Sequence, residues 1–292
     1  MKLAVFSDEV TQDLEKAVAF ATRFKLDGVE LRSVWDKPVH ALTDDELKRI
    51  KDLLGKHNLS VPCISSPVFK CELDDDAAQK EHLGYLRQTI RAAKLLDTKI
   101  IRIFTFWKRG PSAPVWDRIE EQFRPAIPIA EGEGMALGLE NEASTYCATA
   151  AETKRFITEM GSPAIKSVWD PCNELYAGEG ITPYPDAYHL VEPWLAHVHV
   201  KDAYRDASGE GQISPVGDGS IDWKGQFVEL IKKRYAGFLS LETHWRPQAL
   251  SEDVLNRPGG SGFSESGEYA SDLCMRNMLK ILEEAKQAQS GR

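Results

Sequence analysis

The chain has 292 residues, enough for one large domain or two small ones, and its 42% hydrophobic and 28% charged residues are typical of a globular protein. Its formal net charge of −9 argues against binding of nucleic acid through the phosphates, which usually takes a basic face. The early acidic residues Asp8 and Glu9 argue against a signal peptide, and no apolar run approaches the length of a membrane span. We therefore expect a cytoplasmic protein with no nucleic-acid or membrane partner.

The cysteines argue for the same compartment. They are Cys63, Cys71, Cys147, Cys172 and Cys274. Their number is odd and they include no C-x-x-C pair, so neither a disulfide framework nor a structural zinc site is expected. Free thiols of this kind fit a reducing compartment.

Short apolar runs alternate with amphipathic stretches along the whole chain. The runs, each predicted to be a strand, are residues 3–6, 28–34, 60–65, 99–104, 135–140, 165–170, 195–202 and 237–242. The helices predicted to follow them are residues 13–25, a stretch from 43, a stretch over 83–93, residues 115–131, a stretch from 149, residues 186–194, a stretch from 222 and residues 264–289. Thr43-Asp-Asp-Glu46 and Thr149-Ala-Ala-Glu152 are capping boxes, and Asp222 is a predicted N-cap.

This alternation gives eight strand-helix units with nothing left over. Strands that alternate with helices are joined by helical crossovers and run parallel. Eight such units in a chain of this size predict an α/β fold, a closed (β/α)₈ TIM barrel, as a single domain over residues 1–292. A doubly wound open sheet is the alternative. No G-x-G-x-x-G follows the first run, so a dinucleotide-binding fold lacks its main support.

Polar side chains gather where the later strands end, which is the edge that carries the active site in such barrels. The fifth, sixth and eighth runs end at Glu140, Asp170 and Glu242, and the seventh carries His199. Their parity along the strands turns all four inward. Carboxylates that converge in this way repel one another unless a cation lies among them or some are protonated. Three oxygens and one nitrogen suit Mn²⁺, Co²⁺, Mg²⁺ or Zn²⁺.

The seventh run also carries His197, which shares a face with His199. Two histidines on a buried strand are either packed in the core and satisfied by backbone groups or functional. His199 lies at the same depth in the predicted barrel as the three carboxylates, and this position favours a role as a metal ligand. His197 lies one layer deeper, where a hydrogen bond to a ligand carboxylate would let it support the ligands without contacting the metal ion.

The chain resembles the sugar phosphate isomerase/epimerase family, the xylose isomerase-like TIM barrels that also include endonuclease IV. The segments that carry the resemblance are Leu139-Glu140-Asn141, Trp169-Asp170-Pro171, His197-Val-His199-Val-Lys-Asp202, Val216-Gly-Asp-Gly-Ser-Ile-Asp222-Trp and Leu241-Glu242-Thr243. The resemblance implies one divalent metal ion, with Mn²⁺ as the first expectation, bound by Glu140, Asp170, His199 and Glu242. It also implies that Glu140 and Glu242 are the catalytic acid and base, which move a proton through a metal-bound ene-diolate.

Further residues are predicted to bind the substrate or to support the site. Those expected to bind substrate are Arg205, Glu30, Lys201, Trp107 and His244. Asn173, like His197, is expected to support the metal ligands without contacting the metal ion. Some have a structural alternative. Glu30 is equally suited to a buried pair with Arg32, Lys201 to an ion pair with Asp202, and Trp107 to packing.

The departures from the family limit the function. Endonuclease IV and the ketose 3-epimerases have a histidine three residues after the metal-binding aspartate, where this chain has Asn173. The third and fourth runs end in Ser65-Ser66 and Phe104-Thr105, without histidines for further zinc ions. A nuclease therefore lacks support, and a ketose 3-epimerase is placed in doubt.

The leading hypothesis is an isomerase or epimerase of a carbohydrate or polyol. The alternative is a lyase, a dehydratase of an inosose or dehydroshikimate type of substrate. A non-catalytic sugar-binding barrel is a hypothesis from another class. The family resemblance implies a homodimer or homotetramer.

Residues 246–262, which include Pro-Gly-Gly-Ser-Gly, form a long loop after the eighth run and are predicted to lie over the mouth of the barrel as a lid.

Overall fold

A barrel of parallel strands forms the centre of the molecule, as the sequence predicts. The structure, a computed structural model, describes residues 1–178, 180–255 and 257–290. Its central sheet has eight strands in the order β2-β1-β12-β9-β8-β7-β6-β5. They are β1 (Lys2–Phe6), β2 (Gly28–Glu30), β5 (Ile64–Ser65), β6 (Ile100–Ile103), β7 (Ala136–Glu140), β8 (Ile165–Trp169), β9 (Leu195–Val200) and β12 (Phe238–Leu241). Parallel bridges from Gly28 to Ser60 and from Leu31 to Ile64 join the two ends of this sheet.

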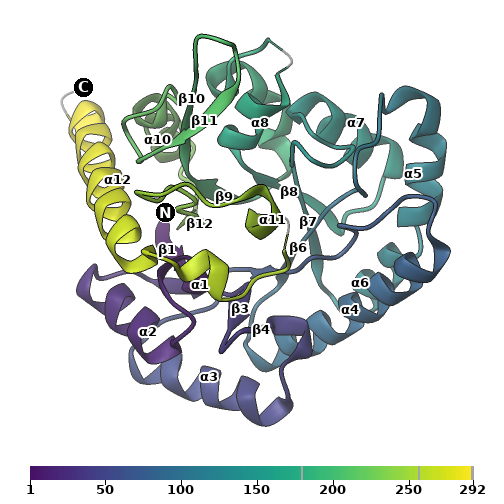
Figure 1. Cartoon of the computed structure of the whole chain (residues 1–292), viewed down its shortest axis with the longest axis horizontal. Coiled ribbons are helices and arrows are strands. Elements are labelled where there is room, and N and C mark those ends of the chain that lie inside the picture. Colours follow the sequence, from purple (N-terminus) through teal and green to yellow (C-terminus); the bar gives the residue numbers. More distant parts are fainter. Residues whose placement is uncertain (179, 256, 291–292) are drawn as a thin grey trace.

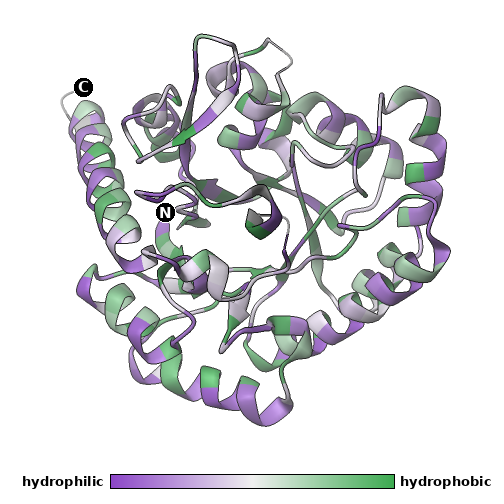
Figure 2. Cartoon of the chain, in the orientation of Figure 1, coloured by the Kyte–Doolittle hydropathy of each residue, from purple (hydrophilic) through white to green (hydrophobic). Residues whose placement is uncertain are grey.

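Helices surround the strands on the outside (Figure 1). They are α2 (Leu14–Arg23), α3 (Asp44–Lys56), α4 (Asp76–Leu95), α5 (Trp116–Phe123), α6 (Ala126–Gly132), α7 (Ala150–Met160), α8 (Pro171–Ala177), α9 (Tyr188–Val191), α10 (Trp223–Lys232) and α12 (Gly267–Ser290). Each mixes hydrophobic and hydrophilic residues along its length (Figure 2). In α3 the buried residues Leu47, Ile50 and Leu54 recur at helical spacing, so one face packs on the strands and the other meets water.

The predicted helix starts are confirmed. In α3 the Glu46 amide donates to the Thr43 hydroxyl at 3.3 Å, and the Thr43 amide donates to the Glu46 carboxylate at 2.8 Å. Thr149 and Glu152 form the same reciprocal pair at the start of α7. Asp222 caps α10 by accepting the Gly225 amide at 2.8 Å. These starts depend on contacts within four residues, which is why local sequence predicts them well.

Two predicted helices differ from the observed ones. The helix expected over residues 115–131 is divided into α5 and α6, because Pro125 between them has no backbone N–H to continue the hydrogen bonding. The helix expected over 186–194 contains only α9 as regular α-helix, between a π-helical turn at Pro183–Ala187 and a 3-10 turn at Glu192–Trp194.

Several short elements at the rim formed by the carboxyl ends of the strands have no counterpart in the prediction. They are α1 (Ser7–Val10), α8, the hairpin of β3 (Ser33–Val34) with β4 (Lys37–Pro38), and the hairpin of β10 (Asp202–Arg205) with β11 (Gly211–Ser214). The start of α8 has a sequence signal, Asp170-Pro171. Asp170 accepts the amides of Cys172 and Asn173 at 2.9 and 3.0 Å, and Pro171 occupies the first helical turn.

The segment after β12 covers the mouth of the barrel, which confirms the predicted place of residues 246–262. It contains α11 (Glu252–Leu255), which lies over the centre of the barrel in Figure 1. Arg257 and Pro258 line the cavity below it. The Gly260 amide donates to the Ser33 hydroxyl at 2.8 Å, and this ties the segment to the chain that follows β2. Residue 256 lies outside the described residues.

The cysteines and the long helices can be compared with the sequence. All five cysteines are free and buried, as expected. Within the described ranges, no helix has both the length and the apolar character that crossing a membrane requires.

Candidate metal centre and active site

The four predicted ligands come together at the carboxyl ends of four neighbouring strands. Glu140 ends β7, Asp170 follows β8, His199 lies in β9 and Glu242 follows β12. One ligand atom from each lies within 4.8 Å of the others, and all four residues are buried. The strands bring them together because β7, β8, β9 and β12 are consecutive around the barrel.

His199 presents a defined nitrogen to the carboxylates. Its Nδ1 lies 2.8 Å from Glu140 Oε1 and 3.6 Å from Glu242 Oε2, and its Nε2 lies 3.2 Å from Glu30 Oε1. Burial disfavours the imidazolium, but Glu140 and Glu30 outweigh burial and raise the pKa of His199 to about 10. A metal ligand must be neutral imidazole, so a cation bound here would replace the proton on Nδ1.

The donor set fits a divalent cation. Glu140 Oε2 and Asp170 Oδ2 are buried and form no regular hydrogen bond with the described residues, although a cationic side chain lies within ion-pair distance of each. Burial raises the pKa of Asp170 to about 6 despite the attraction of Lys201, with Glu140 and Glu242 adding to the increase. Three carboxylates with one imidazole suit a cation of intermediate hardness.

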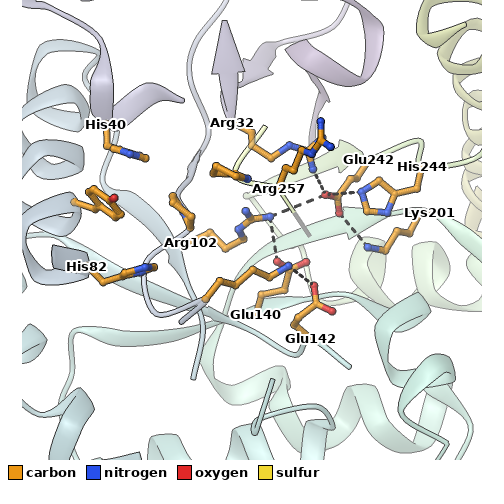
Figure 3. Close-up of a pocket in the computed structure, with 14 residues that line it drawn as sticks. Arg32, His40, His82, Arg102, Glu140, Glu142, Lys201, Glu242, His244 and Arg257 are labelled. Atoms are coloured by element: carbon orange, nitrogen blue, oxygen red, sulfur yellow. Dashed lines mark hydrogen bonds and ion pairs between the residues drawn. The ribbon is translucent and has the colours of Figure 1, made fainter. Parts of the chain in front are cut away.

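Three cationic side chains contact the two glutamates (Figure 3). Arg32 Nη1 lies 3.0 Å from Glu242 Oε1, and Arg102 Nη1 lies 3.2 Å from Glu140 Oε2. Lys201 Nζ lies 2.9 Å from Asp170 Oδ2 and 3.2 Å from Glu242 Oε2. The alternative pair of Lys201 with Asp202 is wrong, because Asp202 instead accepts the backbone amides of residues 217 and 221.

Both glutamates are held ionised. Burial alone would raise the pKa of Glu242, but Lys201 and His244 outweigh it and hold the pKa well below the ordinary value. Burial is likewise outweighed at Glu140, where His199 and Arg102 lower the pKa. Each carboxylate can therefore accept a proton at neutral pH.

Of the predicted substrate-binding residues, Lys201 and His244 line the cavity. His244 Nε2 lies 3.3 Å from Glu242 Oε1 and 3.3 Å from Glu9 Oε1. Asn173 lies behind the cluster, with Nδ2 at 3.5 Å from Glu140 Oε1. These positions are compatible with the predicted roles.

Glu30 requires a correction, because it lies beneath the cluster and away from the cavity. Its Oε1 contacts His199 and accepts the Ser65 hydroxyl at 2.6 Å, and its Oε2 lies 2.7 Å from His197 Nε2. The alternative pair with Arg32 is not formed either, since Arg32 contacts Asp8, Glu9 and Glu242. Glu30 fixes the orientation of His199 from behind, as a carboxylate does for many histidine ligands. His197 hydrogen-bonds this carboxylate and not that of a ligand, and its ring packs edge-on against His199 with the centroids 5.2 Å apart.

Arg205 and Trp107 are not part of the described cavity wall, although the Trp107 ring lies 5.4 Å from Nζ of the lining residue Lys70. Arg205 is exposed and donates to the carbonyl oxygens of Leu175 and Gly209, which holds it along the β10–β11 hairpin. Trp107 forms an isolated bridge with Thr145. Both residues lie beyond the ends of the barrel strands, where strand parity no longer fixes the direction of a side chain.

The cavity has a volume of about 240 Å³, and part of its wall was not predicted. Besides the residues above, it is lined by His40, Pro67, Lys70, His82, Tyr85, Glu142, Arg257 and Pro258. These belong to a 3-10 turn at Val39–Ala41, the loop after β5, α4, the loop after β7 and the segment over the mouth. The sequence signal for them is weak, because only their place after strands two, three, five and eight marks them.

The four-donor cluster predicts the metal content of the purified protein. Purified protein is expected to hold about one tightly bound divalent ion per chain, because the four donors form one cluster. Asp170→Asn should lose this ion. Asp202→Asn is the matched control, since Asp202 lies two residues beyond β9 and contacts backbone amides only. Mass spectrometric metal analysis that found three zinc ions per chain, or equal metal in both variants, would contradict the assignment.

Known proteins give the same fold and place the chain in a family. The model of the family described as xylose isomerase-like TIM barrel matches residues 18–282. An inosose dehydratase of Serratia proteamaculans is 24% identical over 146 residues, which cover 45% of this chain and 49% of the relative. The chain thus spans about half the length of the curated relatives it matches.

Two solved structures extend the similarity over nearly the whole chain. A probable 3-DHS dehydratase from Bacillus anthracis has a TM-score of 0.71 at 21% identity, covering 97% of this chain and 99% of its own. An L-ribulose 3-epimerase has a TM-score of 0.73 at 19% identity, covering 99% and 97%. At this identity the structures establish the fold alone. Together with the barrel and the match over residues 18–282, they show that the chain belongs to the xylose isomerase-like TIM barrel family.

Proposed function

We propose that the protein is a divalent-metal-dependent enzyme that isomerises or epimerises a small carbohydrate or polyol by moving a proton next to a carbonyl. One observation carries the proposal. Glu140 and Glu242 enter one cavity from separate strands, both are ionised, and an oxygen of each lies in the same four-donor cluster. A carboxylate pair of this kind can remove a proton from one carbon and return one to the substrate.

Each residue of the four-donor cluster would have a defined role in this reaction. Glu140, Asp170, His199 and Glu242 would hold the cation, which when bound would polarise the substrate carbonyl. Glu242 is positioned by Arg32 and Lys201 and can accept the proton. Glu140 is positioned by Arg102 and His199 and can return it. General acid-base catalysis of this type contributes on the order of 10²–10⁴-fold.

Dehydration of a keto-polyol is the second candidate, and it shares the first proton transfer. Two findings favour it. The curated relatives are inosose dehydratases. In addition, His244 lines the cavity, and its Nε2 lies 3.3 Å from Glu242 Oε1. An imidazole in that position can protonate a departing hydroxyl group.

One experiment tests the shared step and separates the two outcomes. Metal-loaded protein is incubated in D₂O with ketoses, an inosose and dehydroshikimate, and each reaction is followed by ultraviolet absorbance and by NMR. Isomerisation or epimerisation introduces solvent deuterium without new absorbance, whereas loss of water produces a conjugated product that absorbs. If neither deuterium uptake nor new absorbance occurs with any substrate, the proposal fails and a non-catalytic sugar-binding barrel gains support.

A further inference from the structure

Every cationic side chain on the cavity wall already has a carboxylate partner. Lys70 Nζ lies 3.1 Å from Glu142 Oε2, and Arg257 pairs with Asp253. Arg32, Arg102 and Lys201 contact the acidic groups described above. A phosphate or carboxylate on the substrate would have to compete with these internal partners for every one of the five cations. The described wall of the cavity therefore offers no preformed binding site for a charged substituent.

The wall opposite the metal cluster is of a different kind. His40 and His82 lie on the side of the cavity away from Glu242 and Lys201 (Figure 3). Both pack against Tyr85, with ring centroids 4.3 Å apart for His40 and 5.0 Å apart for His82. The Tyr85 hydroxyl donates to Glu81 at 2.6 Å, so its oxygen can still accept a hydrogen bond.

Both histidines are neutral at pH 7. His82 Nδ1 accepts the Phe69 amide at 2.8 Å, which places the imidazole proton on Nε2. Burial lowers the pKa of His82 to about 4 and also lowers the pKa of His40. His40 Nδ1 is buried and has no hydrogen-bond partner among the described residues, whereas His82 also forms a hydrogen bond with the backbone of Pro67. A neutral N–H donor and open acceptors on one wall match hydroxyl groups, which both donate and accept.

We propose that His40, His82 and Tyr85 form a hydroxyl-binding subsite, and that the substrate is an uncharged polyhydroxylated ketone, neither phosphorylated nor carboxylated. This inference rests on the proposed function for the end of the substrate that reacts. It adds the chemical nature of the part of the substrate that is remote from the carbonyl. The substrate carbonyl would lie at the glutamates and its remote hydroxyls at the three aromatic side chains.

Calorimetric titration of the metal-loaded protein tests the subsite without turnover. The probes are myo-inositol, which lacks the carbonyl and cannot react, a myo-inositol monophosphate and quinate, a carboxylated ring. Myo-inositol is expected to bind at least about tenfold more tightly than either charged probe. Equal or tighter binding of the phosphate or of quinate would overturn the inference, as would failure of myo-inositol to bind at millimolar concentration.

Two variants of His82 separate the subsite from folding. In His82→Asn the amide oxygen can still accept the Phe69 N–H, but the imidazole N–H at the cavity wall is lost, so myo-inositol should bind about three- to tenfold more weakly. His82→Gln can keep a donor near the Nε2 position and loses the Phe69 acceptor, so its affinity should remain closer to that of the original protein. Unchanged affinity in His82→Asn, or equal losses in the two variants, would contradict the subsite.

The outcomes also distinguish this inference from the proposed function. Tight binding of myo-inositol with no proton exchange on any ketone would contradict the proposed function and support the subsite. Efficient turnover of a sugar phosphate would support the proposed function and overturn the subsite.

Discussion

Replacing Glu242 with glutamine is expected to lower turnover by about 10²–10⁴-fold, because the amide cannot take up the substrate proton. Glu140→Gln should have an effect of the same size. Both carboxylates are buried and ionised, and both belong to the four-donor cluster. The measurement is kcat on the substrate identified by deuterium exchange, with circular dichroism to show that the fold is kept. Near-normal activity in either variant would refute its role in proton transfer.

Glu142→Gln is the matched control for the loss of a carboxylate in the cavity. Glu142 lines the same cavity, two residues beyond Glu140, but pairs with Lys70 and lies outside the four-donor cluster. Its replacement should reduce activity far less. Because the two catalytic glutamates are also predicted ligands, the metal content of each variant is measured beside kcat. A loss of activity with full metal content identifies the proton-transfer role itself.

Replacing Glu9 with glutamine is expected to destabilise the fold by about 3–5 kcal/mol, since it removes one partner from a buried ion network. Glu9 Oε1 lies 2.7 Å from Arg32 Nη2, and Glu9 Oε2 lies 2.7 Å from Arg246 Nη2. Arg246 also donates to the carbonyl oxygens of Phe263 and Glu265, so the network joins the N-terminal rim to the segment after β12. Urea unfolding at neutral pH measures the loss.

The same residue gives the stability a defined pH dependence. Burial alone would raise the pKa of Glu9, but His244, Arg246 and Arg32 outweigh it and lower the pKa from 4.5 to about 2. A carboxyl whose pKa is lower in the folded state stabilises it above its unfolded pKa, and this stabilisation is lost as the pH falls through the folded value. The protein should therefore lose about 3 kcal/mol of stability between about pH 5 and pH 2 from Glu9 alone.

Comparison with an exposed pair isolates the effect of burial. Glu15 pairs with Arg49 at 2.6 Å, and both side chains are at least half exposed. Glu15→Gln should cost no more than about 1 kcal/mol. In Glu9→Gln, the fall in stability towards low pH should be shallower than in the original protein. Parallel curves for the two would show that Glu9 does not provide the acid-sensitive stability.

The sequence by itself determined the order of strands and helices, the helix caps and the convergence of the four residues of the candidate metal centre. Strands have a period of two residues, so parity alone turned Glu140, Asp170, His199 and Glu242 to one side. Parallel strands of a barrel end at the same rim, so residues at strand ends meet there even though more than 100 positions separate the first from the last. Capping boxes depend on residues four positions apart at most, and they too could be predicted locally.

Only the tertiary structure decided how the side chains around these four residues are used. Glu30 has inward parity like the ligands, yet its depth in the barrel places it behind His199. Arg205 and Trp107 are not part of the described cavity wall, whereas His40, His82 and Arg257 line it. These residues lie in loops, in α4 and in the segment over the mouth, where no strand period fixes a direction. Their positions depend on packing between segments distant in sequence, and so they appear only once the barrel is closed.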